Sequence, residues 1–266
     1  MSRTTKRLAK AGIVLLPLCY FFPGVVIVYV FCGIYDVTRN RGLNWSVIEA
    51  YFLGNGVLTW VLSPFNIVMD ILALPYRNRG VYKLGDLPKP HQDEIRRLID
   101  AAIEQNLVGK LQQRVEQESR TMFFFKWYGA NTETIVDVPV FHEDYKYVKT
   151  IGVSVFNKRQ STSKHFGPIR PTLRLLYNIN TMDDRSAYIV VGDTTHYWQD
   201  EKMFIFDDTL QHQSFNESDK VRYCLFVDIV RPSGWPALLA GAVWLNRVLT
   251  GKVSSIFYKQ WTLVQR

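Results

Sequence analysis

Hydrophobic and polar positions change their spacing along the chain, and the first pattern is a long uncharged run. From Ala11 to Tyr35 no residue is charged, and Leu, Val, Ile and Phe dominate. A bilayer core needs about 20 consecutive apolar residues. The run therefore predicts a membrane-spanning helix over residues 11–35.

A second run is uncharged from Ala50 to Met69 but contains glycine, asparagine and proline. Over residues 50–72 it is compatible with a second transmembrane helix, a re-entrant segment or an interfacial helix. If both runs span, the positive-inside rule places the main domain in the cytoplasm; if only the first spans, the domain is extracytoplasmic. We favour the hairpin, so residues 1–75 are expected to form a membrane anchor. The flanking cations are Arg3, Lys6, Arg7, Lys10, Arg77, Arg79, Lys83 and Lys89.

Helical spacing follows between Glu94 and Glu118, with charges on the opposite face. It predicts an amphipathic helix against a core, within a helical connector at residues 76–120. We assign it no chemistry. The apolar positions are Ile95, Leu98, Ile99, Ala102 and Ile103.

From Thr134 onward short apolar runs alternate with turn residues, which favours a sandwich or barrel. With candidate metal ligands on separate strands, we expect a mainly β double-stranded β-helix, or jelly roll, over residues 121–232 with helices flanking it. The expected strands are Thr134–Val140, Tyr147–Phe156, Leu173–Ile179, Ala187–Val191, His196–Trp198, Met203–Phe206 and Val221–Val230.

The C-terminal tail, residues 233–266, is expected to be amphipathic. It is mostly apolar from Trp235 to Leu249 and then mixes aromatic residues with cations. That composition suits a membrane interface. A helix packed on the domain's own surface explains it equally well, and both alternatives stand.

Net charge and cysteine spacing limit the classes of partner and the compartment that we expect for this chain. The net charge of +8 suits anionic lipid, nucleic acid or acidic substrates. The cations flank apolar runs or mix with acids and form no aromatic-basic platform, so we do not expect nucleic acid as a partner. Cys19, Cys32 and Cys224 have no disulfide or zinc spacing, which favours a reducing compartment.

Two histidines in similar settings carry the candidate chemistry. His165 precedes the strand-like run of residues 172–177, and His212 follows Phe204–Phe206. Two imidazoles at neighbouring strand ends can hold one divalent metal. Arg222, ten residues after His212, opens another apolar strand and can hold a carboxylate. The set predicts a metal-dependent oxygenase with an oxo-acid cosubstrate.

An acidic third ligand is missing from its usual place. In a common non-haem iron site two histidines are joined by one acid, often two residues after the first histidine, where this chain has Gly167. Asp207 and Asp208 lie near His212 in sequence, but we do not expect them to be ligands.

Together these residues resemble the aspartyl/asparaginyl β-hydroxylase family of iron(II)- and 2-oxoglutarate-dependent dioxygenases, which have a jelly-roll fold. The family uses two histidines without an acidic ligand, so Gly167 fits. The resemblance covers roughly residues 148–232. It rests on His165-Phe166-Gly167-Pro168, Leu173-Arg174, Phe206-Asp207-Asp208, His212, Arg222 and Asp228.

The resemblance implies a role for each of five residues, with O2 as the second cosubstrate. His165 and His212 match the two iron ligands. Arg222 matches the arginine that pairs with the distal carboxylate of 2-oxoglutarate. Ser154 matches a serine that helps to hold this cosubstrate, and Arg174 an arginine near its other carboxylate.

One position departs from the family, and one segment points to a branch within it. The family's Arg-x-His pattern has a histidine where this chain has Leu176, so one contact with the cosubstrate is lost or replaced.

The apolar N-terminus and the stretch Ser63–Met69 are similar to the membrane-bound lipid A 2-hydroxylase and ornithine-lipid hydroxylase branch. That implies hydroxylation of a membrane lipid's acyl chain, at C2, at a bacterial inner membrane with a cytoplasmic catalytic domain.

Other interpretations remain open. The protein could hydroxylate Asp or Asn side chains of a protein substrate, or it could be a non-catalytic lipid-binding jelly roll, which Leu176 favours. Arg174 and Arg222 could be ordinary strand-surface cations. His91, His142 and His196 are expected to be plain hydrogen-bonded residues, and no pattern indicates the oligomeric state.

Overall fold

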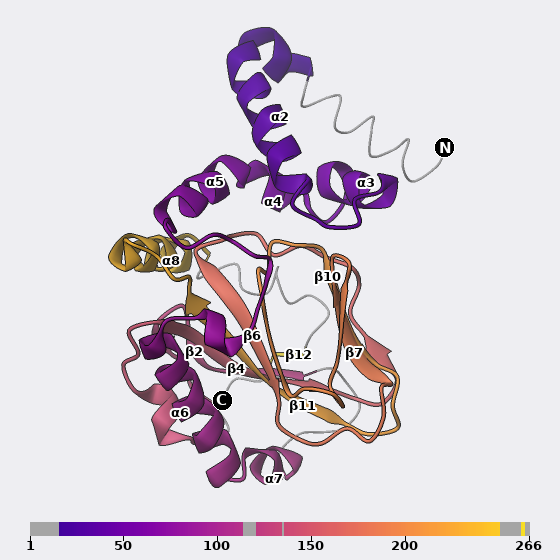
Figure 1. Cartoon of the computed structure of the whole chain (residues 1–266), viewed down its shortest axis with the longest axis vertical. Coiled ribbons are helices and arrows are strands. Elements are labelled where there is room, and N and C mark those ends of the chain that lie inside the picture. Colours follow the sequence, from indigo (N-terminus) through magenta and orange to yellow (C-terminus); the bar gives the residue numbers. More distant parts are fainter. Residues whose placement is uncertain (1–15, 114–120, 135, 251–261, 264–266) are drawn as a thin grey trace.

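A computed structural model describes residues 16–113, 121–134, 136–250 and 262–263, and its strands form two sheets. The larger sheet has the order β1-β9-β6-β11-β4-β2-β12, with β3 also paired to β2, and the smaller has the order β5-β10-β7-β8 (Figure 1). The strands are β1 (Val81–Tyr82), β2 (Thr121–Trp127), β3 (Ala130–Asn131), β4 (Val148–Phe156), β5 (Gln160–Ser161), β6 (Thr172–Asn178), β7 (Ala187–Val191), β8 (Thr194–Tyr197), β9 (Met203–Phe206), β10 (His212–Asn216), β11 (Arg222–Val230) and β12 (Thr262–Leu263).

The two sheets share one core, and helices cover the outer face of the larger sheet. On β11, Leu225 and Val227 pack with α6 (Lys89–Glu104) and α7 (Leu107–Gln112), whereas Cys224 and Phe226 pack toward the smaller sheet. This alternation is the two-residue period of a strand. All of β11 is buried because both faces of the sheet are covered. The predicted mainly β architecture is confirmed.

Two local predictions are wrong. The single helix expected from Glu94 to Glu118 is divided into α6 and α7 by Asn106, whose φ of 48° ends the helical path; residues 114–118 lie outside the described residues. The described residues of the expected strand Thr134–Val140 form no strand, and the 3-10 helix η2 (Pro139–His142) begins within it, because Pro139 has no N–H to donate to a ladder; residue 135 lies outside the described residues. Strands β2 and β10 were not predicted.

The N-terminal apolar runs form short helices. Residues 16–21 are helical, and α2 (Pro23–Val37), α3 (Trp45–Leu53), α4 (Val57–Val61) and α5 (Ser63–Leu72) follow. Gly54 ends α3 and Pro64 lies in the first turn of α5, so the second run is not one continuous helix. Within the described ranges no helix is long and apolar enough to cross a membrane, and residues 11–15 of the first expected span lie outside those ranges.

A buried ion cluster, called here the arginine–aspartate cluster, joins α2 and α5 to the β domain. Arg170 lies at its centre, with Nη1 2.7 Å from Asp70 Oδ2 and with Nη2 bonded to Asp36. Asp70 and Asp36 come from α5 and α2, so both helices are tied into the fold. The cluster consists of Arg39, Arg170, Arg231, Asp36, Asp70 and Asp207.

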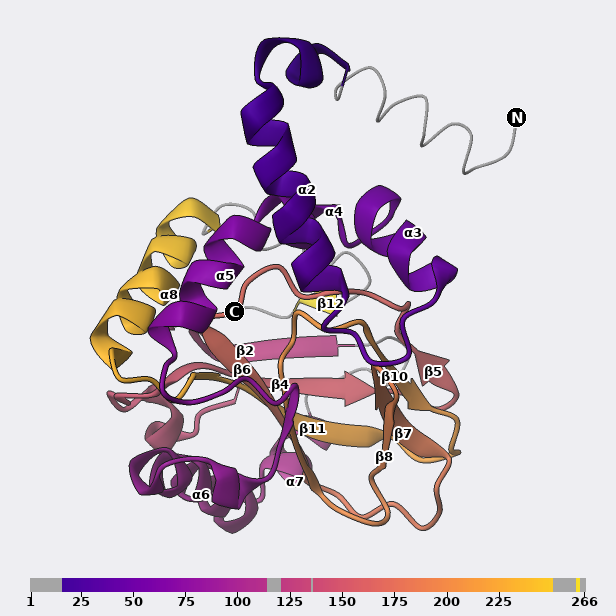
Figure 2. The ribbon, with the colours of Figure 1, turned by 45° about the horizontal axis from the view of Figure 1, so that its top comes forward.

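The tail begins with α8 (Pro236–Thr250), which lies beside α5 (Figure 2). Leu239 of α8 is buried against Met69 and Val230, as expected of a helix packed on the domain. Trp244 on the same helix is 55% exposed. The helix therefore has one face on the protein and one apolar face toward the surroundings; residues 251–261 and 264–266 lie outside the described residues.

Candidate active site

The two predicted histidines lie next to each other at the edge of the smaller sheet. His212 opens β10, and His165 lies in the loop between β5 and β6. The two residues form an isolated antiparallel bridge, with N···O distances of 3.0 and 2.9 Å. Their ring centroids are 4.2 Å apart. Backbone pairing thus holds both imidazoles at one place, although they are far apart in the sequence.

Both rings have the same hydrogen-bonding arrangement. Nδ1 of His165 is 2.7 Å from the Ser163 carbonyl oxygen, and Nδ1 of His212 is 2.8 Å from that of Leu210. A carbonyl oxygen only accepts, so each neutral ring carries its hydrogen on Nδ1 and has its lone pair on Nε2. Burial, then the neighbouring His165, hold the pKa of His212 well below its ordinary value. His212 is therefore neutral near pH 7, the form that binds metals.

The N-terminal helices position the loop that carries His165. Thr59 Oγ1 in α4 donates to the Gly167 carbonyl oxygen at 3.0 Å. Asn66 in α5 donates to the Pro168 carbonyl oxygen at 3.1 Å and accepts from the Arg170 amide at 3.0 Å. These bonds hold residues 167–170 from the side opposite to the sheets. The helices are thus part of the framework around the site.

Arg222 is buried without a counter-charge. Its side chain is 1% exposed, which excludes a strand-surface cation. Nη2 donates to Ser214 Oγ at 2.9 Å, but Nε and Nη1 have no hydrogen-bond partner in the described part of the chain. Burial lowers the pKa of Arg222, and only the nearby Cys224 thiol opposes this. A buried guanidinium with two nitrogens that lack hydrogen-bond partners suits a bidentate carboxylate.

A cavity of about 90 Å³ brings the five predicted residues together: His165, His212, Ser154, Arg174 and Arg222 all line it. Three of them come from neighbouring strands of the larger sheet, because β11 pairs with β4 on one side and β6 on the other. The two histidines close the cavity from the smaller sheet. Sequence positions 154–222 thus converge on a single space between the sheets.

Arg174 has a different setting from that of Arg222. Its Nε donates to Asp228 Oδ1 at 2.6 Å, and its Nη2 donates to Asp208 Oδ2 at 3.2 Å. The guanidinium carbon lies 3.8 Å from the ring centroid of Phe226. Two carboxylates therefore already neutralise this guanidinium. Its predicted contact with the cosubstrate remains a prediction.

Asp208 occupies the space beside Gly167. A Cβ built on Gly167 would overlap the Asp208 carboxylate. Asp208 Oδ1 is also 3.4 Å from Nε2 of His212. Asp208 was not expected to be a ligand, and the only signal in the sequence was its position four residues before His212. Within the described ranges, no group of three His, Cys, Asp or Glu side chains forms a metal cluster.

The neighbouring Asp207 has a structural role. Burial would raise its pKa, but Arg39, Arg170 and Arg231 outweigh burial and hold the pKa below its ordinary value. Its Oδ1 accepts from the Thr209 amide at 3.0 Å, as expected of a turn residue. The hydrogen bonds expected for two other histidines are also present, from His91 to Val230 and from His196 to Glu201.

Comparison with known proteins identifies the family. A family model described as Aspartyl/Asparaginyl beta-hydroxylase matches residues 90–232, just over half of the chain. This chain belongs to the aspartyl/asparaginyl β-hydroxylase family. The match contains all five predicted site residues that line the cavity. It ends just before the tail and leaves α2 to α5 outside.

One similar protein is the ornithine lipid ester-linked acyl 2-hydroxylase of Rhizobium tropici. It is 35% identical over 95 residues, which is 35% of this chain and 34% of the relative. The match therefore spans about a third of the length of that protein.

Solved structures give only distant matches. The protein TT1209 from Thermus thermophilus is 12% identical with a TM-score of 0.31, over 46% of this chain and 95% of its own. Salicylate 1,2-dioxygenase from Pseudaminobacter salicylatoxidans is 10% identical with a TM-score of 0.29, over 53% of this chain and 35% of its own. These likenesses are too distant to bear on the site or its chemistry.

Proposed function

We propose that this protein is an iron(II)- and 2-oxoglutarate-dependent dioxygenase that hydroxylates the acyl chain of a membrane lipid, at C2. The observation that carries the proposal is the buried Arg222, which has no counter-charge, in one cavity with two histidines that both bond through Nδ1 to carbonyl oxygens. Bound iron and 2-oxoglutarate would together activate O2 for insertion of one oxygen atom into a C–H bond, with succinate and carbon dioxide as coproducts.

The residues of the cavity suit these ligands. His165 and His212 each present Nε2, because their Nδ1 atoms are bonded to carbonyl oxygens. Arg222 would pair with one carboxylate of 2-oxoglutarate, held in place by Ser214. The Ser154 hydroxyl now donates to the Cys224 carbonyl oxygen at 3.3 Å. With the cosubstrate bound, it would donate to the same carboxylate as Arg222. Bidentate pairing of this kind fixes both position and orientation.

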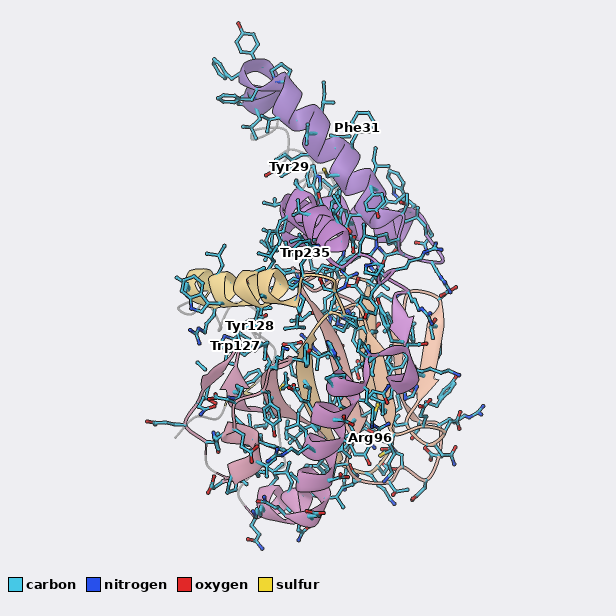
Figure 3. The ribbon with its side chains drawn as sticks, turned by 60° about the vertical axis from the view of Figure 1, so that its left-hand side comes forward. Tyr29, Phe31, Arg96, Trp127, Tyr128 and Trp235 are labelled. Carbon is cyan, nitrogen blue, oxygen red and sulfur yellow. The ribbon has the colours of Figure 1, made fainter. Side chains whose placement is uncertain are left out.

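The exposed apolar side chains support a lipid substrate at a membrane. Every exposed large hydrophobic side chain of the described residues, except Ile103, lies within residues 16–76 or 235–248. Figure 3 shows Phe31 on α2 and Trp235 before α8 toward this helical end, and Arg96 on α6 at the opposite end. A large exposed apolar surface of this kind marks a membrane or partner interface. This surface supports a location at a membrane, and we propose the bacterial inner membrane with the catalytic domain in the cytoplasm.

A protein substrate is the second candidate, favoured only by the family as a whole. The apolar surface and the similarity to a lipid hydroxylase favour lipid. A non-catalytic lipid-binding protein is the third candidate, since Leu176 replaces the family's histidine. Leu176 is buried beside Phe226 and Phe204 and lines the active-site cavity, which still contains Arg222 and the histidine pair.

Mass spectrometry of membrane lipids tests the proposal. Cells that carry the gene, cells that lack it and cells with His165→Ala should be compared. We expect a lipid heavier by one oxygen only in the presence of the unmodified protein, and its identity would distinguish lipid A from ornithine lipid. Unchanged lipids, with succinate still formed from 2-oxoglutarate by the purified protein, would favour a protein substrate. If neither product forms, the enzymatic proposal is wrong.

A further inference from the structure

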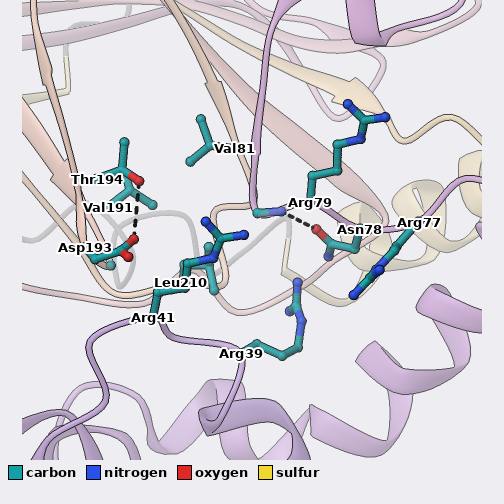
Figure 4. Close-up of a pocket in the computed structure, with 12 residues that line it drawn as sticks. Arg39, Arg41, Arg77, Asn78, Arg79, Val81, Val191, Asp193, Thr194 and Leu210 are labelled. Carbon is teal, nitrogen blue, oxygen red and sulfur yellow. Dashed lines mark hydrogen bonds between the residues drawn. The ribbon is translucent and has the colours of Figure 1, made fainter.

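A second cavity, larger than the active-site cavity, lies under the N-terminal helices. It measures about 700 Å³ and is bordered by the α2–α3 connection, the α5–β1 connection and the β7–β8 turn (Figure 4). Four arginines line it, two from each connection: Arg39, Arg41, Arg77 and Arg79. Among the described residues that line this cavity, Asp193 is the one acid.

Two of the four arginines are already neutralised. Arg39 Nη2 lies 2.7 Å from Asp207 Oδ2, and Arg79 Nη1 lies 2.7 Å from Asp86 Oδ1. Arg41 and Arg77 have no ion-pair partner within the described part of the chain. Figure 4 shows the guanidinium groups of Arg39, Arg41 and Arg77 between the two connections. The cavity thus has uncompensated positive charge, which favours an anion with several oxygen acceptors.

The cavity adjoins the histidine pair. Val191, which lines it, is the register partner of His212. Leu210, which also lines it, accepts the hydrogen bond from His212 Nδ1. Neighbouring strands lie about 4.7–4.9 Å apart, so the cavity wall at Val191 is one strand spacing from His212. A ligand held here could therefore present another part of itself at the active site.

The position of the cavity beside the apolar helices suits a lipid headgroup. The helices α2 to α5 expose many of the apolar side chains described above, and they lie at one end of the molecule, next to the two sheets (Figure 1). If the helices contact the acyl region, the arginines lie where anionic headgroups attract cations. A carbon at C2 is one bond from the acyl carbonyl, so its headgroup must be held near the reacting carbon.

We propose that this arginine-lined cavity binds the phosphate group of the lipid headgroup while the acyl chain reaches the histidine pair. The inference rests on the proposed function and narrows the substrate to a phosphate-bearing lipid. A zwitterionic ornithine headgroup fits less well, because only Asp193 would meet its ammonium group.

The test compares the purified full-length chain with the double variant Arg41→Gln/Arg77→Gln. A control double variant, Arg96→Gln/Arg159→Gln, removes the same charge from exposed positions away from the cavity. Binding is titrated in neutral detergent micelles that contain phosphatidic acid or ornithine lipid, and separately with inorganic phosphate. We expect the cavity variant to bind phosphatidic acid about 10- to 30-fold more weakly and the control to change less than about threefold.

Three outcomes would overturn the inference: equal weakening in both double variants, equal affinity of the unmodified chain for ornithine lipid, or strong cavity-dependent binding of inorganic phosphate alone, which would indicate a site for a free anion. Succinate formation from 2-oxoglutarate is measured in the same samples. Its absence from the unmodified protein would contradict the proposed function, whereas its presence alongside unchanged lipid binding would contradict only the headgroup site.

Discussion

Two buried arginines, Arg170 and Arg222, have opposite surroundings. Both are almost inaccessible, at 0% and 1% exposure. Arg170 is bonded to carboxylates on two helices and lies 3.5 Å from Asp207; Arg222 has one hydroxyl partner, Ser214. Burial lowers the pKa of both, but the carboxylates reverse this for Arg170 and raise its pKa.

The difference in charge compensation distinguishes a structural arginine, Arg170, from an arginine that we expect to bind a ligand, Arg222. Removing a guanidinium from water costs several kcal/mol unless a counter-charge and hydrogen bonds compensate. Arg170 is compensated within the chain and joins α2 and α5 to the β domain. Arg222 is not, so its compensation is expected from a bound carboxylate. Two equally buried arginines thus differ in what they indicate. Arg170 stabilises the packing of the helices on the β domain, whereas Arg222 indicates a ligand site.

The largest expected effect is that of Arg170→Met. It would leave Asp36, Asp70 and Asp207 with too little positive charge in a buried cluster. Breaking a buried ion pair from one side costs about 3–5 kcal/mol. We expect a loss of this size in the free energy of unfolding, measured by urea denaturation in micelles. A loss below about 1 kcal/mol would show that the cluster does not hold the helices to the domain.

Acid should weaken the same cluster. The pKa of Asp207 is lowered in the folded protein, because Arg39, Arg170 and Arg231 outweigh burial. Its stabilising contribution is therefore complete above the unfolded pKa of about 4 and is lost as the pH falls through the lower folded value. Urea denaturation between pH 7 and pH 3 should show stability falling below about pH 4, with a flatter profile for Asp207→Asn. Parallel profiles for both proteins would contradict this assignment, and Asp200→Asn at the exposed pair with Arg185 is the control.

A smaller effect is expected for Thr59→Val. It removes the hydrogen bond to the Gly167 carbonyl oxygen while it keeps the side-chain shape. The expected cost is about 1 kcal/mol in unfolding free energy. Metal binding should weaken a few-fold as the His165 loop loosens. Thr195→Val on exposed β8 is the matched control, and identical metal affinity in both variants would show that α4 does not position the loop.

The smallest change in stability is expected for Arg222→Met. Replacing a buried, uncompensated charge by an apolar side chain is often neutral or stabilising. We expect the unfolding free energy without cosubstrate to stay within about 1 kcal/mol or to rise. A loss as large as that of Arg170→Met would mean that Arg222 is structural too, which would remove the contrast between them.

The sequence predicted the site better than its surroundings. His165, His212 and Arg222 were singled out by their places near strand ends, whereas Ser154 and Arg174 were named only through the family resemblance; all five line one cavity, and their roles remain predictions. The position of the Asp208 carboxylate beside Gly167 and His212 was not predicted. It depends on the absence of a side chain at Gly167 and not on sequence spacing.

Long-range contacts explain the other omissions. The arginine–aspartate cluster joins residues from opposite ends of the chain, as in Asp36 with Asp207 through Arg39, and no local pattern indicates such pairs. Strand β2 is buried along almost its whole length, so it lacks the alternation that reveals a strand. The apolar N-terminal runs were interpreted as membrane spans from their length and lack of charge. That interpretation did not predict that α4 and α5 form hydrogen bonds to the loop beside His165.

Binding of 2-oxoglutarate tests the central claim most directly. The affinity of the metal-loaded protein, measured by calorimetry without oxygen, should be compared with that of Arg222→Met. Loss of one partner of a buried charge pair costs about 2–5 kcal/mol, so we predict binding at least about 30-fold weaker, with the metal retained. Equal affinity in the two proteins would show that Arg222 does not receive the cosubstrate's carboxylate.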